Sequence, residues 1–170
     1  TIMTTEPKFV PKEAVEISVG GKIPVRIRLI DCVGYMVEGA TGHLENDTER
    51  MVKTPWFGEE IPFTKAAELG THKVIHDHST IGIVVTCDGS FGDLPAGNYQ
   101  ESEERTIAEL KTLGKPFVIL LNTTRPYSDA VRKQSEEMFH KYQIPVLPVN
   151  CEQLKKEDIT MILEQVLLEF

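Results

Sequence analysis

The sequence predicts an α/β fold, in which helices flank a doubly wound, mostly parallel sheet that carries an antiparallel β-hairpin at one edge. Apolar and polar residues alternate on both sides of Gly20-Gly21, which is typical of a hairpin. Three later segments are continuous apolar runs, as in strands buried on both faces of a parallel sheet. Helical patterns separate these runs, so the β and α units alternate.

The hairpin is expected over residues 14–31. The apolar positions that alternate with polar ones are Val15, Ile17, Val19, Val25, Ile27 and Leu29. Charged residues such as Glu16, Arg26 and Arg28 occupy the alternate positions. One face of the hairpin is therefore expected to meet solvent, as at the edge of a sheet.

The parallel strands are expected at residues 81–85, 117–121 and 144–149, with helices between them. Asn98, followed by Glu101, suits a capping box at the start of one helix, and Ser128 suits the cap of the next. The last helix carries an apolar stripe of Ile159, Ile162, Leu163, Val166 and Leu167. Residues 38–60 are expected to form an irregular insertion, and residues 1–170 a single, partial nucleoside-triphosphatase domain.

Composition narrows the possible functions. The net charge of −8 argues against nucleic-acid binding, which needs a basic surface. The three cysteines, Cys32, Cys87 and Cys151, are widely spaced and odd in number. We therefore expect no disulfide framework, and we expect the protein to lie in a reducing cytosol. No apolar run reaches the ~18 residues that span a bilayer.

An antiparallel hairpin that leads into alternating β and α units is typical of the GTPase-like class of P-loop proteins. The hairpin ends in Asp31-Cys32-Val33-Gly34, the DxxG pattern of that class. The Asp31 carboxylate would hold Mg²⁺ through water, and the Gly34 amide would face the γ-phosphate. Alternatively, a strand simply ends at an Asp and turns at a Gly.

Other segments match the class in position. Thr4 and Thr5 precede the hairpin where the first switch segment lies, and a threonine hydroxyl there would complete the Mg²⁺ coordination; the alternative is a frayed polar terminus. Tyr35 follows the DxxG pattern where Ras-like enzymes orient water with Gln. Tyr35 cannot do the same, so other groups would have to position the attacking water.

The predicted base-binding segment is Asn122-Thr123-Thr124-Arg125, where GTPases carry Asn-Lys-x-Asp. Guanine needs an acceptor for its two donors, but Arg125 has only donors. Each unpaired buried donor costs about 1–3 kcal/mol, so ATP is the expected nucleotide. Asn122, Thr123 and Arg125 are the candidate base-binding residues. The alternative is that Arg125-Pro126 merely ends a strand and the base is held elsewhere.

Six segments in series carry a family resemblance: TTEPKFVP, RLIDCVGY, EEIPFTKAAELGTHKVI, HSTIGIVVTCDGSFGD, GKPFVILLNTTRPY and IPVLPVN. Together they resemble the stage IV sporulation protein A family. The resemblance implies a Mg²⁺-dependent ATPase with Thr4 and Thr5 as sensor threonines and Asp31 as the Walker-B-type acid. An alternative is a structural assembly module in which nucleotide binding is vestigial.

The resemblance also implies partners and a location. Members polymerise on the outer surface of the forespore, on the mother-cell side in the cytoplasm, and form the basement layer of the spore coat. Implied partners are further copies of the protein, other coat morphogenetic proteins and a small amphipathic peptide on the forespore membrane.

The sequence departs from the class because it contains no GxxxxGK[ST] motif. We expect the first strand and the P-loop to lie upstream, with that strand between Ile27–Leu29 and Ile83–Val85. Without the phosphate cradle, residues 1–170 alone are not expected to hydrolyse ATP.

Two further groups of residues have side chains that can bind metal ions. His72 and His76 have the i, i+4 spacing of metal ligands on a helix, but no cysteine or carboxylate cluster is close in sequence, and we interpret them as a solvated helix face. Asp88-Gly89-Ser90, with Asp93, is interpreted as a surface turn near the nucleotide edge.

Overall fold

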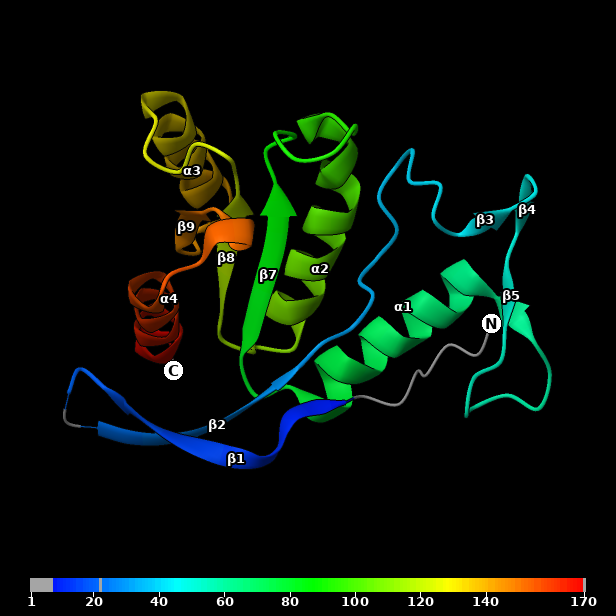
Figure 1. Cartoon of the computed structure of the whole chain (residues 1–170), viewed down its shortest axis with the longest axis horizontal. Coiled ribbons are helices and arrows are strands. Elements are labelled where there is room, and N and C mark those ends of the chain that lie inside the picture. The colour runs from blue at the N-terminus through cyan, green and yellow to red at the C-terminus, as the bar shows by residue number, and fades with distance from the viewer. Residues whose placement is uncertain (1–7, 22, 170) are drawn as a thin grey trace. The chain divides into compact units, whose positions relative to one another are not determined.

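The computed structural model describes residues 8–21 and 23–169, and these form two compact units (Figure 1). The first unit comprises the described residues up to Ile17 together with Val25–Ser79, and the second comprises the remaining ones. Each unit is described by itself below. That residues 1–170 form a single domain stays a prediction.

The predicted hairpin is confirmed. It consists of β1 (Phe9–Val19) and β2 (Ile23–Ile30), which pair as a two-stranded sheet. Gly20 and Gly21 in the turn have φ values of 56° and 70°, the left-handed conformation that glycine adopts without steric cost. The hairpin begins at Phe9, earlier than the alternation alone predicts, because Pro11 and Lys12 interrupt the pattern but not the strand.

The expectation of an irregular insertion at residues 38–60 is wrong in detail, because the first unit contains short antiparallel pairs there. β3 (Leu44–Glu45) pairs with β4 (Thr48–Glu49), and β5 (Met51–Val52) pairs with β6 (Ile61–Pro62). Helix α1 (Phe63–Lys73) follows and widens into a π-helical turn at Val74–His78. Val52, Ile61 and Ala66, joined by Phe63, form the core that holds these elements together.

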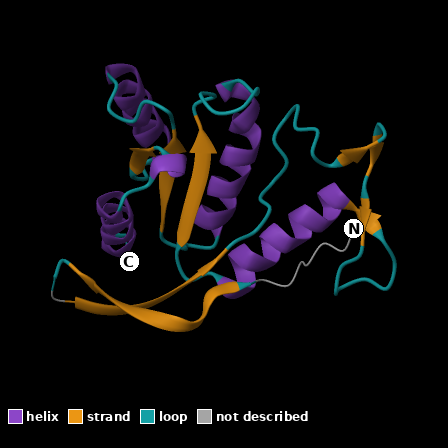
Figure 2. Cartoon of the chain, in the orientation of Figure 1, coloured by secondary structure: helices purple, strands orange, loops and turns teal. Residues whose placement is uncertain are grey.

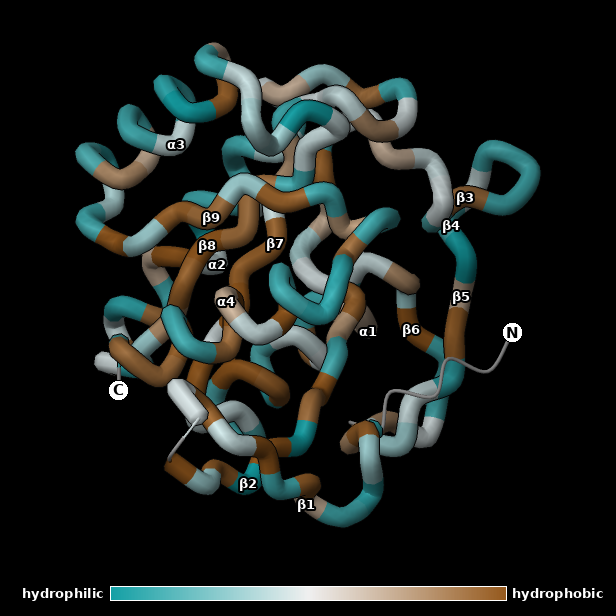
Figure 3. The backbone as a smooth tube through the Cα atoms, turned by 60° about the vertical axis from the view of Figure 1, so that its left-hand side comes forward, coloured by the Kyte–Doolittle hydropathy of each residue, from teal (hydrophilic) through white to brown (hydrophobic). Residues whose placement is uncertain are grey.

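The second unit contains the predicted parallel sheet, in the order β7-β8-β9 (Figure 2). The strands are β7 (Gly82–Cys87), β8 (Phe117–Asn122) and β9 (Val146–Val149), and both pairings are parallel. Figure 3 shows these strands among the most apolar segments of the chain. The central strand β8 is buried at five of its six positions, which confirms that the continuous apolar runs belong to a buried parallel sheet.

Helices lie on both faces of this sheet. Helix α4 (Lys156–Leu168) packs Ile162 and Val166 against Val118 and Leu120 of β8. Helix α2 (Gln100–Thr112) packs on the opposite face, where the side chains of Leu110 and Phe117 both lie close to Gly82 of β7. Helix α3 (Asp129–Tyr142) lies against α2, since Tyr142 donates a hydrogen bond to Glu103 over 2.6 Å. The second unit is therefore a three-layer α/β structure.

One of the two predicted helix caps is confirmed. The Ser128 hydroxyl accepts a hydrogen bond from the Val131 amide at the start of α3. The Asn98 capping box is wrong, because Asn98 lies inside a 3-10 turn, Ala96–Tyr99, that runs directly into α2. In the described part of the chain, no helix is long and apolar enough to cross a membrane.

Candidate functional site

The DxxG segment of the first unit directly follows β2. Asp31 is exposed, and its Oδ1 accepts a hydrogen bond from the Cys32 amide over 2.9 Å. Gly34 has a φ of 84°, and a Cβ there would meet no atom within 4 Å. Glycine is thus favoured at Gly34 by its backbone conformation rather than by lack of space. Carboxylate oxygens are ligands that Mg²⁺ prefers, and the role of Asp31 as a Mg²⁺ ligand stays a prediction.

Two neighbours of Asp31 face the interior rather than solvent. Tyr35 is buried, which suits a packing role. Burial raises the pKa of the half-buried Cys32 thiol, the negative charge of Asp31 acts in the same direction, and a hydrogen bond with the Gly34 backbone opposes them. Cys32 is therefore a protonated thiol near neutral pH. Thr4 and Thr5 lie outside the described residues, so their role stays a prediction.

In the second unit, a partly buried hydrogen-bond network joins the carboxyl ends of β7 and β8. Thr123 is 0% exposed, and its hydroxyl donates to Asp88 Oδ2 over 2.6 Å. The same hydroxyl oxygen accepts from the Arg125 amide over 3.1 Å. Thr123 thus holds the start of the β8–α3 loop against the end of β7.

Ser90 and Asn122 extend this network. Asp88 Oδ1 accepts from the Ser90 amide, and the Ser90 hydroxyl accepts from the Thr124 amide, both over 2.9 Å. Asn122 Oδ1 accepts from the Cys151 amide over 3.0 Å, which ties the loop after β9 to β8. The loops after all three strands are therefore interlinked at the carboxyl edge of the sheet, where open α/β sheets bind their ligands.

The charge of Asp88 is stabilised inside this network. Burial acts to raise its pKa, but hydrogen bonds from Ser90 and Thr123, together with the positive charge of Arg125, bring the pKa below its ordinary value. Asp88 is thus ionised at neutral pH and acts as an acceptor that orders the loops. Asp88 does more than begin the predicted surface turn, since the residue is half-buried and both its oxygens accept hydrogen bonds.

Arg125 is exposed and lines a pocket of about 350 Å³, within the size range of small-molecule sites. Lys155 and Asp158 at the start of α4, and Asn150 after β9, contribute to the same wall. The pocket presents one arginine, one lysine and one carboxylate beside the β8–α3 loop.

The structure brings Asn122, Thr123 and Arg125 together in the second unit, whereas Asp31 and Gly34 belong to the first. Asp88 was not predicted from the sequence as the partner of Thr123, nor was Ser90 as the partner of Thr124 and Asp88. The sequence does contain a pattern that points to Asp88: an acid directly follows one buried strand, and a threonine directly follows the next. Two such residues meet when the strands are parallel and the last strand residues are paired, as Cys87 and Asn122 are.

Comparison with known proteins identifies the family. The family model described as "Stage IV sporulation protein A, ATPase domain" matches residues 1–170. The chain is 49% identical to stage IV sporulation protein A of Bacillus subtilis (strain 168), 49% to that of Bacillus anthracis and 51% to that of Clostridioides difficile (strain 630).

Each of these matches covers 100% of the chain but 35% of the relative. The chain thus spans about a third of the length of the curated relatives it matches. No solved structure matches the chain. With a family model that covers every residue, this chain belongs to the stage IV sporulation protein A family, in the part described as its ATPase domain.

Proposed function

We propose that this chain is the nucleotide-binding part of a protein that hydrolyses ATP to drive its own assembly into the basement layer of the spore coat. The observation that carries the nucleotide-binding part is the network at the carboxyl edge of the parallel sheet, which orders the loop bearing Arg125 beside a pocket of about 350 Å³. The match to the ATPase-domain model over residues 1–170 supports the reaction.

The choice of ATP over GTP follows from Arg125. Its guanidinium offers only hydrogen-bond donors, and it lies at the pocket wall with Lys155, another donor. The donors of guanine would face donors there, while adenine offers ring nitrogens as acceptors. Thr123 is buried, so in this proposal it positions Arg125 through the loop backbone, and Asn122 holds the neighbouring loop through Cys151.

Bound Mg²⁺ would neutralise charge on the β- and γ-phosphates. Asp31 is the residue of the described chain that we assign to hold it, with Thr5 as a second ligand and Thr4 beside it as a sensor. The Gly34 amide is assigned to the γ-phosphate, where the absence of a side chain leaves room for the ligand.

An unpaired strand edge supports the proposal that a further β-α unit completes the fold. β7 pairs with β8 on one side only, and no strand within residues 8–21 and 23–169 pairs with its other edge. On the face that α4 covers over Val118 and Leu120, the adjacent Ile83 and Val85 are 38% and 59% exposed. We assign this edge and face to the P-loop strand and its helix.

Assembly is the remaining part of the proposal. The named relatives are sporulation proteins, and we propose that the full-length protein polymerises at the forespore outer membrane, on its cytoplasmic mother-cell side. Copies of itself, other coat morphogenetic proteins and a small amphipathic membrane-surface peptide are the proposed partners.

The test is ATP hydrolysis by the full-length protein, measured as phosphate release with Mg²⁺. Asp31→Asn removes the charge and is expected to lower kcat by at least ~10²-fold, the loss typical of a missing electrostatic contact in the transition state. Asp47→Asn is the matched control, because Asp47 is exposed in the β3–β4 turn at a φ of 58° that Asn also tolerates.

If Asp31→Asn hydrolyses ATP as fast as the wild type while the protein still polymerises, the chain is an assembly module with vestigial nucleotide binding. Competition of ATP and GTP for the wild-type site adds a second criterion. A preference for GTP would contradict the role assigned to Arg125 without touching the role of Asp31.

A further inference from the structure

The helix of the first unit changes its winding between two histidines. Helix α1 ends at Lys73, and the next turn is π-helical, with the Ser79 amide bonded to the Val74 carbonyl over 2.9 Å. In an α-helix, residue i+4 lies about 40° beyond residue i. A π turn takes in more residues, so i+4 comes more nearly into line with i. π turns of this kind are frequent at functional sites.

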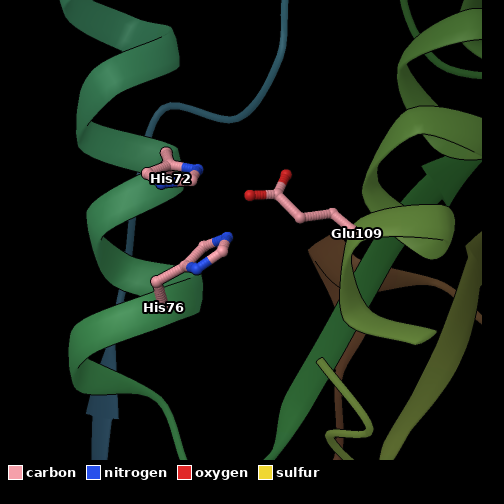
Figure 4. A group of neighbouring side chains, drawn as sticks. All are labelled: His72, His76 and Glu109. Atoms are coloured by element: carbon pink, nitrogen blue, oxygen red, sulfur yellow. The ribbon is translucent and has the colours of Figure 1, made fainter. Parts of the chain in front are cut away.

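This winding stacks His72 and His76. Their ring centroids are 3.8 Å apart and the ring planes differ by 32°. Figure 4 shows both imidazoles projecting from the same side of the helix. Donor nitrogens of the two rings lie within 4.8 Å of each other. Glu109, which Figure 4 also draws, lies on α2 of the second unit and is not part of this pair.

The surroundings of the pair suit a cation. His72 is exposed and His76 half-buried, so an ion can reach both rings. Lys73 is the positively charged residue next to His72 in the sequence. Its Nζ forms an ion pair with Asp77 Oδ2 at 4.0 Å and lies 5.3 Å from the centre of the Trp56 ring. Its charge is therefore partly offset and directed to another side chain.

We propose that His72 and His76 form a chelating site for a first-row transition-metal cation of the Zn²⁺ class, with water in the remaining coordination positions. Imidazole nitrogens at i and i+4 of a helix are a recurrent Zn²⁺ ligand pair, and imidazole suits Zn²⁺, Cu²⁺ and Ni²⁺. His72 is exposed, as expected for a solvated helix face, and the proposal adds metal binding to that face. The site is independent of the proposed nucleotide site and uses none of its residues.

The test is titration of Zn²⁺ into the purified chain, followed by calorimetry. We expect one saturable site that is weakened at least ~10-fold by His72→Ala and equally by His76→Ala, because either change turns a bidentate site into a single ligand. His140→Ala is the control, since His140 is an exposed histidine of α3 in the second unit, and its loss should leave Zn²⁺ affinity unchanged.

A thermal scan guards against misfolded variants. Zn²⁺ should raise the Tm of the wild type and of His140→Ala. In His72→Ala and His76→Ala the metal-free Tm should equal that of the wild type, and the rise with Zn²⁺ should disappear. Unchanged Zn²⁺ affinity in the two single variants, an equal loss in His140→Ala, or no saturable site in the wild type would each overturn the proposal.

Discussion

Replacing Thr123 with Val tests whether the buried hydroxyl holds the carboxyl edge of the sheet together. Valine keeps the branched shape of threonine but loses the oxygen, which donates to Asp88 over 2.6 Å and accepts from the Arg125 amide over 3.1 Å. Thr123 is 0% exposed, so water cannot replace these contacts without opening the site. The change should destabilise the second unit.

The magnitude follows from the two lost bonds. A hydrogen bond to a charged group contributes about 1.5–3 kcal/mol and a neutral one about 0.5–1.5 kcal/mol. The added methyl group of valine recovers up to ~0.8 kcal/mol. The expected net loss is ~2–3 kcal/mol, which corresponds to a fall in Tm of about 4–12 °C for a chain of this size.

The loss should depend on pH. Because the pKa of Asp88 lies below its ordinary value, its ionised form stabilises the folded state above about pH 4, and that stabilisation is lost as the pH falls through the folded pKa. Thr123→Val removes one bond that lowers this pKa. The stability difference between wild type and variant should therefore be full at pH 7 and shrink below pH 4.

Thermal and urea unfolding of both proteins at pH 7 and pH 3.5 would measure this. Thr123→Ser is the control, since it keeps the hydroxyl and loses only a buried methyl group, a loss of about 1 kcal/mol. The reasoning is refuted if the Tm of Thr123→Val at pH 7 lies within about 1–2 °C of the Tm of Thr123→Ser, a difference on the order of 0.5 kcal/mol. The hydroxyl would then not stabilise the carboxyl edge of the sheet.

Two further predictions concern the loop after β7 and its free edge. Gly89 and Gly92 both have left-handed φ values, 79° and 68°, but a Cβ at Gly89 would lie 2.6 Å from the Ala96 amide nitrogen while one at Gly92 would meet nothing within 4 Å. Gly89→Ala should thus cost ~1–3 kcal/mol more than Gly92→Ala in urea unfolding, and equal losses would contradict this. By hydrogen exchange, the Ile83 and Val85 amides should exchange roughly 100-fold or more faster in residues 1–170 than in the full-length protein if a P-loop strand pairs with β7; equal rates would argue against that pairing.

The sequence by itself determined the elements whose signals are local. Alternation around Gly20-Gly21 specified the hairpin, and three continuous apolar runs specified strands buried between helices, because both patterns depend only on the period of the side chains along one segment. The cap at Ser128 was equally readable, since a cap involves residues a few positions apart. The match of six segments in series also sufficed to identify the family.

Only the tertiary structure decided which polar residues meet. Thr123 looked like a base-contacting residue, yet it is buried and bonded to Asp88, 35 positions away. That pairing depends on the register between β7 and β8, which no local pattern encodes. Likewise the π turn after α1 stacks His72 on His76, although the sequence predicts only that they share a helix face. Contacts between distant segments arise from the packing of whole elements, and a sequence pattern describes one element at a time.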